Sequence, residues 1–141
     1  MQGKEYLHEA LEQDRKVTRK LEQLERLQSM ADKATSVIKD MPGAPQRNTS
    51  SREVLLVKLI DLKHEINQEI DKLVDMKRER SKIIEQIEQP EYQDILIFRY
   101  LLALKWEDVA SRIDRSISYT YKLHGWALQE LDKILEKKIK R

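Results

Sequence analysis

The sequence predicts an all-α protein, in which a long N-terminal helical hairpin or coiled coil precedes a C-terminal three-helix helix-turn-helix domain. Lys, Glu, Leu and Ile dominate the 141 residues, while Gly and Pro number only three each. This composition favours long helices over sheets. Apolar residues recur at steps of three and four over two long segments, which is the periodicity of amphipathic helices. We therefore predict two domains, a helical hairpin or coiled coil over residues 1–89 and a helix-turn-helix domain over residues 90–141.

The first long segment has apolar residues at nearly heptad spacing, which is typical of a coiled coil. Polar residues interrupt this seam at Asp14, Gln28 and Thr35. The seam comprises Leu7, Val17, Leu21, Leu24, Ala31 and Ile38, with Leu11 and Leu27 beside it.

The stretch MPGAPQRNTSS, residues 41–51, breaks this periodicity. Its Pro and Gly residues cannot continue a helix, so we predict a loop here. Ser50 is followed three residues later by Glu53, the spacing of a capping box. We therefore expect the second long helix to begin near Arg52.

The second long segment extends to about Glu88. Its predicted seam comprises Leu56, Leu59, Ile66, Ile70, Leu73, Ile84 and Ile87. Lys63, Lys77 and Arg80 fill the remaining seam positions, where their stems can lie on apolar surface while their charges reach water. Two segments of similar length joined by a short loop suggest an antiparallel hairpin. The alternative is a single extended coiled coil that the loop merely interrupts.

A broad apolar stripe on the second segment suggests that hairpins pair with one another. Leu55, Leu62, Val74 and Ile83 add a second apolar edge beside the seam. Two hairpins could form a four-helix bundle. We therefore expect a homo-oligomer assembled through residues 1–88.

The C-terminal part has the pattern of three helices. Pro90 can occupy the first turn of a helix over residues 91–103. A short helix follows at WEDVASRI, residues 106–113. Asp114 then suits a left-handed turn position, and Ser116 is a good N-cap for the third helix. The inner face of that helix is predicted to carry Thr120, Leu123, Ala127, Leu128 and Leu131.

Two helices joined by a three-residue turn and packed on a preceding helix are typical of DNA-binding helix-turn-helix proteins. The second helix of the pair can enter the major groove. The candidate DNA-binding residues are Lys105, Arg112, Arg115, Ser116, Ile117, Ser118, Tyr119, Tyr121 and Lys122. The pattern alone leaves two alternatives open, a plain three-helix packing unit and a protein interface that uses the exposed tyrosines.

The run WEDVASRIDRSISYTYKLHGWALQEL, residues 106–131, resembles the promoter-reading region 4 of bacterial sigma factors without gaps. Residues 88–135 are also similar to small phage and prophage proteins, the ArpU/RinA-like regulators. That resemblance depends on the pair Arg99-Tyr100, the run Trp106 to Ala110 and the run Tyr121 to Gly125. It implies a phage transcription regulator that switches on late or packaging genes. The resemblance to sigma factors implies that Ile117, Ser118, Tyr121 and Lys122 occupy the base-reading positions.

The remaining features argue against other classes of function. The chain has no Cys, and its three His residues lie far apart, so no metal-ligand spacing is present. No catalytic triad or phosphate loop is evident, so we expect no catalytic residues, no enzyme activity and no cofactor. No signal peptide or membrane span is evident, so we expect a cytoplasmic protein of the bacterial host cell with no membrane partner.

Charge permits nucleic-acid binding without requiring it. Residues 91–141 hold 10 Lys and Arg against 8 Asp and Glu, whereas residues 1–90 hold 17 of each. Our leading hypothesis is an oligomeric regulator that binds double-stranded DNA and could also contact host RNA polymerase. The alternatives are a DNA-packaging component resembling a small terminase subunit, which would form a ring, and a polymerase-binding module that does not itself read DNA.

Overall fold

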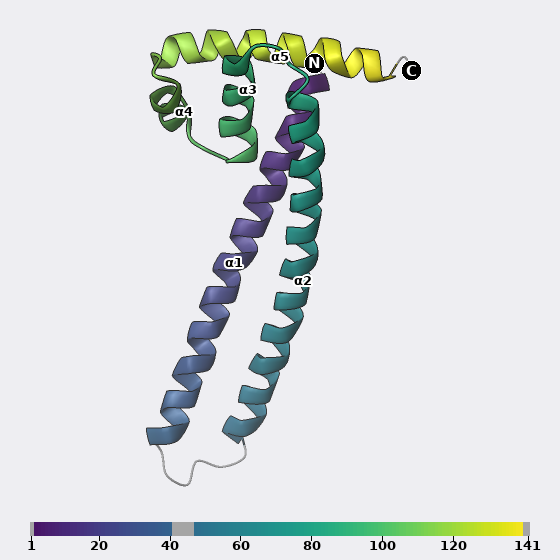
Figure 1. Cartoon of the computed structure of the whole chain (residues 1–141). Helices are drawn as coiled ribbons and strands as arrows, with labels where there is room; N and C mark the ends of the chain where they lie inside the picture. Colours follow the sequence, from purple (N-terminus) through teal and green to yellow (C-terminus); the bar gives the residue numbers. More distant parts are fainter. Residues whose placement is uncertain (1, 41–46, 140–141) are drawn as a thin grey trace. The chain divides into compact units, whose positions relative to one another are not determined.

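The computed structural model describes residues 2–40 and 47–139, and within these the side chains of residues 2–34 and 51–139. Every regular element in these ranges is a helix, which confirms the predicted all-α class. The elements in chain order are α1 (Gln2–Asp40), α2 (Arg47–Ile84), α3 (Pro90–Leu96), the π-helical turn η1 (Ile97–Leu101), α4 (Trp106–Ile113) and α5 (Ile117–Ile139) (Figure 1). None of these described helices combines the length and the apolar character that crossing a membrane requires.

The chain forms two compact units. Unit 1 contains Met1–Asp14 and Lys72–Arg141, and unit 2 contains Arg15–Asp71. This division differs from the predicted boundary between residues 89 and 90. The reason is that the first turns of α1 and the last turns of α2 share a hydrophobic core with the C-terminal helices.

The core of unit 1 has two parts. The smaller part centres on Ile95, Val109 and Leu123, which join α3, α4 and α5. In the larger part, α5 lies across the adjacent ends of α1 and α2 (Figure 1). The buried residues of this larger part are Leu7, Ala10, Leu11, Ile83, Ile84, Ile87, Leu96, Tyr100, Leu101, Ala127, Leu131 and Leu135.

Polar contacts fix the start of α1 on α5 within unit 1. The Gly3 amide donates to Oδ1 of Asp132 at 2.7 Å. This contact satisfies one of the backbone donors that the first turn of any helix leaves unpaired. A Cβ atom at Gly3 would lie 2.6 Å from the same oxygen and 3.0 Å from Leu131. A larger residue at this position would therefore have to displace the Asp132 side chain.

Arg80 has a different environment from the one predicted. Its side chain is 6% exposed rather than reaching water. Its guanidinium donates to Oε2 of Glu9 at 2.8 Å and to the backbone carbonyl of Tyr6 at 3.0 Å, and it lies 4.1 Å from the centre of the Tyr6 ring. The predicted solvation of this charge is wrong, because α1 supplies acceptors that close over the arginine.

Ion pairs show that the two long helices run antiparallel within each unit, as a hairpin requires. In unit 1, Lys77 lies 3.1 Å from Asp14. In unit 2, Nζ of Lys16 lies 3.3 Å from Glu69, and Nζ of Lys20 lies 3.7 Å from Glu65.

Most of the predicted seam is buried, but Leu24 and Ile70 are half-buried and two further residues are exposed. Val17, Ala31, Leu59 and Ile66 are buried in unit 2. Leu21 and Leu56 are 42% and 45% exposed, so their predicted burial is wrong. The side chain of Ile38 lies outside the described residues.

The second long helix is longer at its start than predicted. It begins at Arg47, which places Ser50 inside the helix and rules out the predicted capping box. Residues 47–51 contain neither Pro nor Gly, so nothing prevents the helix from extending back toward Pro45. The rest of the predicted loop, residues 41–46, lies outside the described residues.

This helix also ends earlier than predicted, at Ile84 rather than near Glu88. A turn follows, in which the Gln93 side-chain amide donates to the backbone carbonyl of Ile87. This bond satisfies a carbonyl that the helix no longer pairs.

The first C-terminal helix changes its winding midway. In η1, the Leu102 amide donates to the carbonyl of Ile97 at 2.9 Å, a separation of five residues that defines a π-helical turn. The wider turn alters which residues face inward. Tyr100 is 3% exposed, whereas Leu102, two residues later, is 49% exposed.

Candidate nucleic-acid interface

The predicted turn between α4 and α5 has the expected geometry. Asp114 adopts the left-handed conformation with φ 57° and ψ 49°, and the Arg115 amide donates to the carbonyl of Ala110 at 3.1 Å. These features close the end of α4. Oγ of Ser116 then accepts a hydrogen bond from the Tyr119 amide at 3.1 Å, the contact of an N-cap residue. Both sequence-based assignments, Asp114 in the turn and Ser116 at the cap, are confirmed.

The candidate residues of α5 are exposed. Ile117, Tyr119 and Tyr121 are 42%, 38% and 51% exposed, and Ser118 and Lys122 are also at the surface. The opposite side of this helix buries Thr120, Leu123, Ala127 and Leu131, as predicted. No other described part of unit 1 therefore covers the side that the sequence assigned to DNA.

The candidate residues do not form one continuous face. At about 100° per residue, Ser118 and Lys122 point away from the core, whereas Tyr119 and Tyr121 lie about 160° apart on opposite edges. We call the exposed residues Ser118, Tyr121, Lys122, Gly125, Trp126 and Gln129 the outer face of α5. Tyr119 lies beyond the Trp126 edge of this face, and Ile117 lies beyond its Tyr121 edge.

A cluster of ring contacts fixes the Tyr121 edge. The Trp106 ring lies edge-on to Tyr121, with centroids 5.2 Å apart, and edge-on to His124 at 4.6 Å. His124 also stacks on Tyr100, and Nε2 of His124 lies 2.8 Å from Oη of Tyr100. Arg99 lies 4.8 Å from the centre of the Trp106 ring. We call these five residues the aromatic cluster.

The aromatic cluster also shapes the connection between η1 and α4. Nη1 of Arg99 donates to the carbonyl of Leu104 at 2.9 Å. Between these residues, Ala103 adopts a φ of 56°, which a residue with a side chain rarely takes. Arg99 therefore holds a strained connection in the conformation that places Trp106 against α5.

His124 is neutral at ordinary pH in this environment. Burial, together with the positive charges of Lys4 and Arg99, lowers the pKa of its imidazole from 6.5 to about 4. Burial likewise raises the pKa of the Tyr100 hydroxyl. The pair is thus an uncharged hydrogen-bonded contact that joins η1 to α5.

A second set of contacts lies along the other edge of the outer face. The rings of Tyr119 and Trp126 meet edge-on with centroids 6.2 Å apart, and the Arg115 guanidinium lies 5.2 Å from the centre of the Tyr119 ring. Nε of Arg115 also donates to Glu91 at 3.0 Å, and this contact raises the pKa of the arginine. Arg115 is therefore exposed but already paired, so it is a weaker phosphate ligand than the sequence suggested.

The remaining predicted cations lie on α4 or at its start. Lys105 is the N-cap residue of α4 and is exposed. Arg112 lies in the last turn of that helix, with its guanidinium 5.4 Å from the centre of the Phe98 ring. Both are exposed, and Arg112 lies five residues before the start of α5 along the chain.

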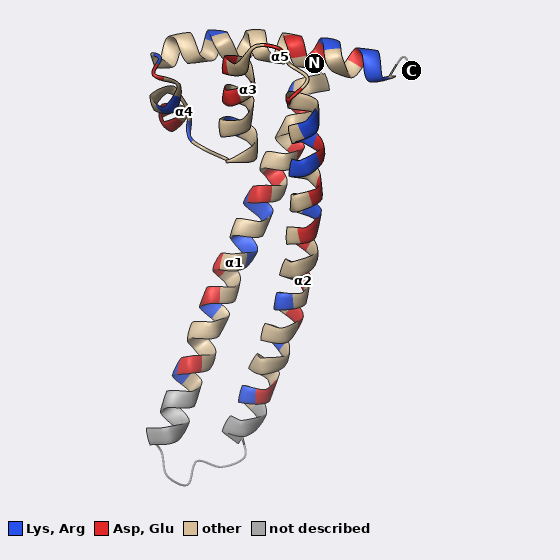
Figure 2. Cartoon of the chain, viewed as in Figure 1, with Lys and Arg blue, Asp and Glu red and all other residues tan. Residues whose placement is uncertain are grey.

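Positive charge is sparse on the first part of α5. Lys122 is the one Lys or Arg between residues 117 and 132, whereas Lys133, Lys137 and Lys138 occupy the last part of the helix (Figure 2). The outer face is consequently aromatic and polar with a single cation.

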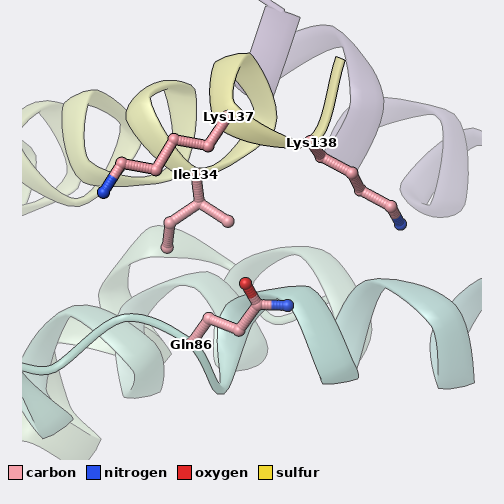
Figure 3. A pocket seen from close by; sticks show the side chains of 4 residues that line it. All are labelled: Gln86, Ile134, Lys137 and Lys138. Carbon is pink, nitrogen blue, oxygen red and sulfur yellow. The ribbon is translucent and has the colours of Figure 1, made fainter. Parts of the chain in front are cut away.

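A shallow pocket lies near the basic end of α5. Gln86 of the turn after α2 lines it together with Ile134, Lys137 and Lys138 of α5, and its volume is about 420 Å³ (Figure 3). Ile134 comes five residues after Gln129, the last residue of the outer face, and at about 100° per residue it points about 140° away from it around the helix. The pocket is therefore separate from the outer face.

Metal chemistry has no site in the described part of the chain, where no three His, Asp or Glu side chains come together to hold an ion. His8 is 49% exposed and lies 3.3 Å from Glu12 one turn along the same helix.

Sequence reasoning missed the structural role of Arg99, Tyr100 and His124 in this region. A signal for this role was present in the sequence. The aromatic cluster brings together the segments that carry the resemblance to phage regulators, namely Arg99-Tyr100, Trp106 and the run from Tyr121 to Gly125. Their convergence could not be derived from spacing alone, since it depends on the π-helical turn.

A family model described as "Protein of unknown function (DUF1492)" matches residues 34–132 of the chain. No curated protein matches the chain, and no solved structure matches it.

Proposed function

We infer that this chain, which belongs to the DUF1492 family, binds double-stranded DNA with the outer face of α5 and acts as an oligomeric transcription regulator. One observation carries the proposal: Ser118, Tyr121 and Lys122 are exposed on a helix that begins directly after a helix-turn-helix turn. A major groove about 12 Å wide admits one helix presented in this way. The resemblance to sigma region 4 assigns these three residues, together with Ile117, to base reading.

Preorganisation supports the proposal. Trp106 fixes the ring of Tyr121, and the Tyr119 ring fixes Trp126, so both edges of the outer face are ordered before any partner arrives. Ordering side chains on binding costs roughly 0.5–1.5 kcal/mol for each flexible residue. A surface that is already ordered avoids that cost.

The few cations near the outer face determine the affinity for DNA that we expect. Lys122 lies on the outer face, Lys105 is exposed at the start of α4, and Arg112 lies in the last turn of α4, while Arg115 is engaged by Glu91. Few phosphate contacts give weak binding by a single copy. We therefore expect useful affinity only when two or more copies bind one duplex, since tethering raises the effective concentration of the second copy.

Unit 2 offers a surface for such an assembly. Val54, Leu56, Val57 and Ile60 of α2 are 45–57% exposed, and Met30 of α1 is 57% exposed. Exposed apolar side chains concentrated on one pair of helices favour contact with another protein surface. We propose that the same surface of a second copy covers them, which agrees with the predicted homo-oligomer through residues 1–88.

A second candidate function has its own supporting observation. Ile117, Tyr119, Tyr121 and Trp126 are all at least 38% exposed around a single lysine. Protein interfaces are enriched in such aromatic residues. A polymerase-binding module that does not read DNA would present this surface as well. The DNA-packaging alternative depends instead on the formation of a ring of subunits.

Fluorescence anisotropy with duplexes selected from a randomised library tests DNA binding directly. Lys122→Ala and Tyr121→Ala together should abolish preference for the selected duplex, and Lys122→Ala alone should lower the salt slope of binding by about 0.9. Lys133→Ala, which removes an exposed lysine from a later turn of α5, is the matched control. Selection that enriches no duplex, together with binding to purified RNA polymerase that Tyr121→Ala removes, would favour the second candidate.

A further inference from the structure

Gly125 has no explanation in the packing of the chain. It lies in the middle of α5, where glycine weakens a helix relative to alanine. A Cβ atom built at Gly125 meets nothing within 4 Å, and the residue is exposed. The other described glycine, Gly3, differs because a Cβ there would meet Asp132 at 2.6 Å. Packing therefore favours glycine at position 3 and gives no reason for glycine at position 125.

The position of Gly125 along α5 is informative. Ser118, Lys122, Gly125 and Gln129 follow one another at steps of four, three and four, and all four are exposed. Such spacing places residues in one line along a helix. Gly125 therefore interrupts the layer of side chains at the centre of the outer face, between Lys122 and Gln129.

Ordered aromatic rings border this interruption. Tyr121, one turn before Gly125, is held by Trp106, and Trp126, the next residue, is held by Tyr119. Lys122 lies three residues before Gly125, about one turn of helix, so its side chain is a neighbour of Gly125 on the helix surface. The result is a bare stretch of helix backbone with rings on both sides and one cation beside it.

We propose that the sugar–phosphate backbone of one DNA strand crosses α5 at Gly125, where the lack of a side chain lets the helix approach the strand closely. This inference rests on the proposed DNA binding and assigns to Gly125 the role of setting the depth of the helix in the groove. Glycine commonly occupies positions where another backbone comes near. Lys122 pairs with a phosphate of the crossing strand.

The polar character of the line favours nucleic acid over a protein partner. Ser118, Lys122 and Gln129 are polar, and the exposed apolar rings lie at the edges of the face rather than along its centre. A phosphodiester needs a cation and donors at the centre of the contact, whereas a protein interface is most apolar there.

The test uses the full chain with Gly125→Ala. Alanine should raise the thermal midpoint by about 2–4 °C, because it is the better helix former and has open space. The same substitution should lower affinity for the selected duplex by about tenfold or more, and the salt slope should fall by about 0.9 for every phosphate that the protein no longer reaches. Gly125→Val should lower affinity further, because its side chain is larger. It should raise the thermal midpoint less than alanine does, because valine is a poorer helix former. Gln129→Ala, one turn further along the same line, is the control and should lower affinity less.

The outcomes separate this inference from the proposed function. If Gly125→Ala raises the thermal midpoint and leaves affinity and salt slope unchanged, while Lys122→Ala still weakens binding, the crossing point is wrong and DNA binding stands. If the wild-type chain binds no duplex at low salt, both are wrong. A variant that gains stability and loses affinity supports the inference, since general damage to the fold cannot produce that pair of changes.

Discussion

Nε2 of His124 lies 2.8 Å from Oη of Tyr100, and this contact joins the middle of α5 to the π-helical turn η1. The two rings stack with centroids 5.7 Å apart, and Trp106 closes the third side at 4.6 Å from His124. Trp106 also contacts the exposed Tyr121, so its ring connects the pair of Tyr100 and His124 to the surface of α5.

His124 should make the stability of unit 1 depend on pH. Burial, with the charges of Lys4 and Arg99, lowers the pKa of His124 to about 4, against 6.5 in the unfolded chain. Between pH 6.5 and pH 4 the His124 imidazole is protonated in the unfolded state but neutral in the folded state. The stability contributed by neutral His124 is therefore fully present above pH 6.5 and is lost as the pH falls toward 4. The thermal midpoint should decrease between pH 7 and pH 5, and His124→Gln should show a smaller decrease. Equal decreases in the two proteins would refute the assignment.

Arg80 should contribute to stability chiefly through its packing and its bond to the chain of α1. Arg80→Ala removes a buried guanidinium that lies over the Tyr6 ring and donates to the Tyr6 carbonyl, so we expect a loss of about 2–3 kcal/mol in the free energy of unfolding. Arg80→Met keeps most of the buried volume and should lose less. Glu9→Gln should cost well under 1 kcal/mol, because the Glu9 side chain is 65% exposed. Chemical denaturation measures all three, and a Glu9→Gln loss equal to that of Arg80→Ala would contradict this account.

The contact between Gly3 and Asp132 should show strong coupling. Gly3→Ala forces the Asp132 carboxylate away from the start of α1, and Asp132→Ala removes that cap, so each should cost about 1 kcal/mol. The double variant should cost less than the two losses combined, because the new methyl group no longer meets the carboxylate. Strict additivity in a double-mutant cycle would show that the clash does not occur in solution.

The exposed apolar residues of unit 2 should control assembly. We expect light scattering to give a dimer or tetramer for the wild-type chain, and the combined substitution Val57→Glu and Ile60→Glu to reduce its mass while circular dichroism remains helical. Lys58→Glu alters the net charge by the same amount at an exposed neighbouring position and should leave the mass unchanged. A ring of eight to ten copies would instead favour the DNA-packaging alternative.

Local signals predicted the helix-turn-helix well. Asp114 and Ser116 act through contacts with residues three to five positions away, and the inner face of α5 follows from helical periodicity. Such short-range relations are visible in a sequence.

The features that the sequence did not reveal depend on distant partners. Arg80 is buried because Glu9 and the Tyr6 carbonyl reach it from a helix more than 70 positions earlier in the chain. Tyr100 is buried because a π-helical turn shifts the helical register. The first turns of α1 join the C-terminal helices through Gly3 and Leu7, which no boundary drawn along the chain could anticipate.

Mapping a bound duplex onto backbone amides by nuclear magnetic resonance tests the central claim most directly. On titration of the labelled protein with the selected duplex, we predict that shift changes concentrate between Ser116 and Gln129 and at Arg112, with little change at Lys133–Ile139. Changes confined to the basic end of α5, or no changes at low salt, would contradict the assignment of DNA to the outer face.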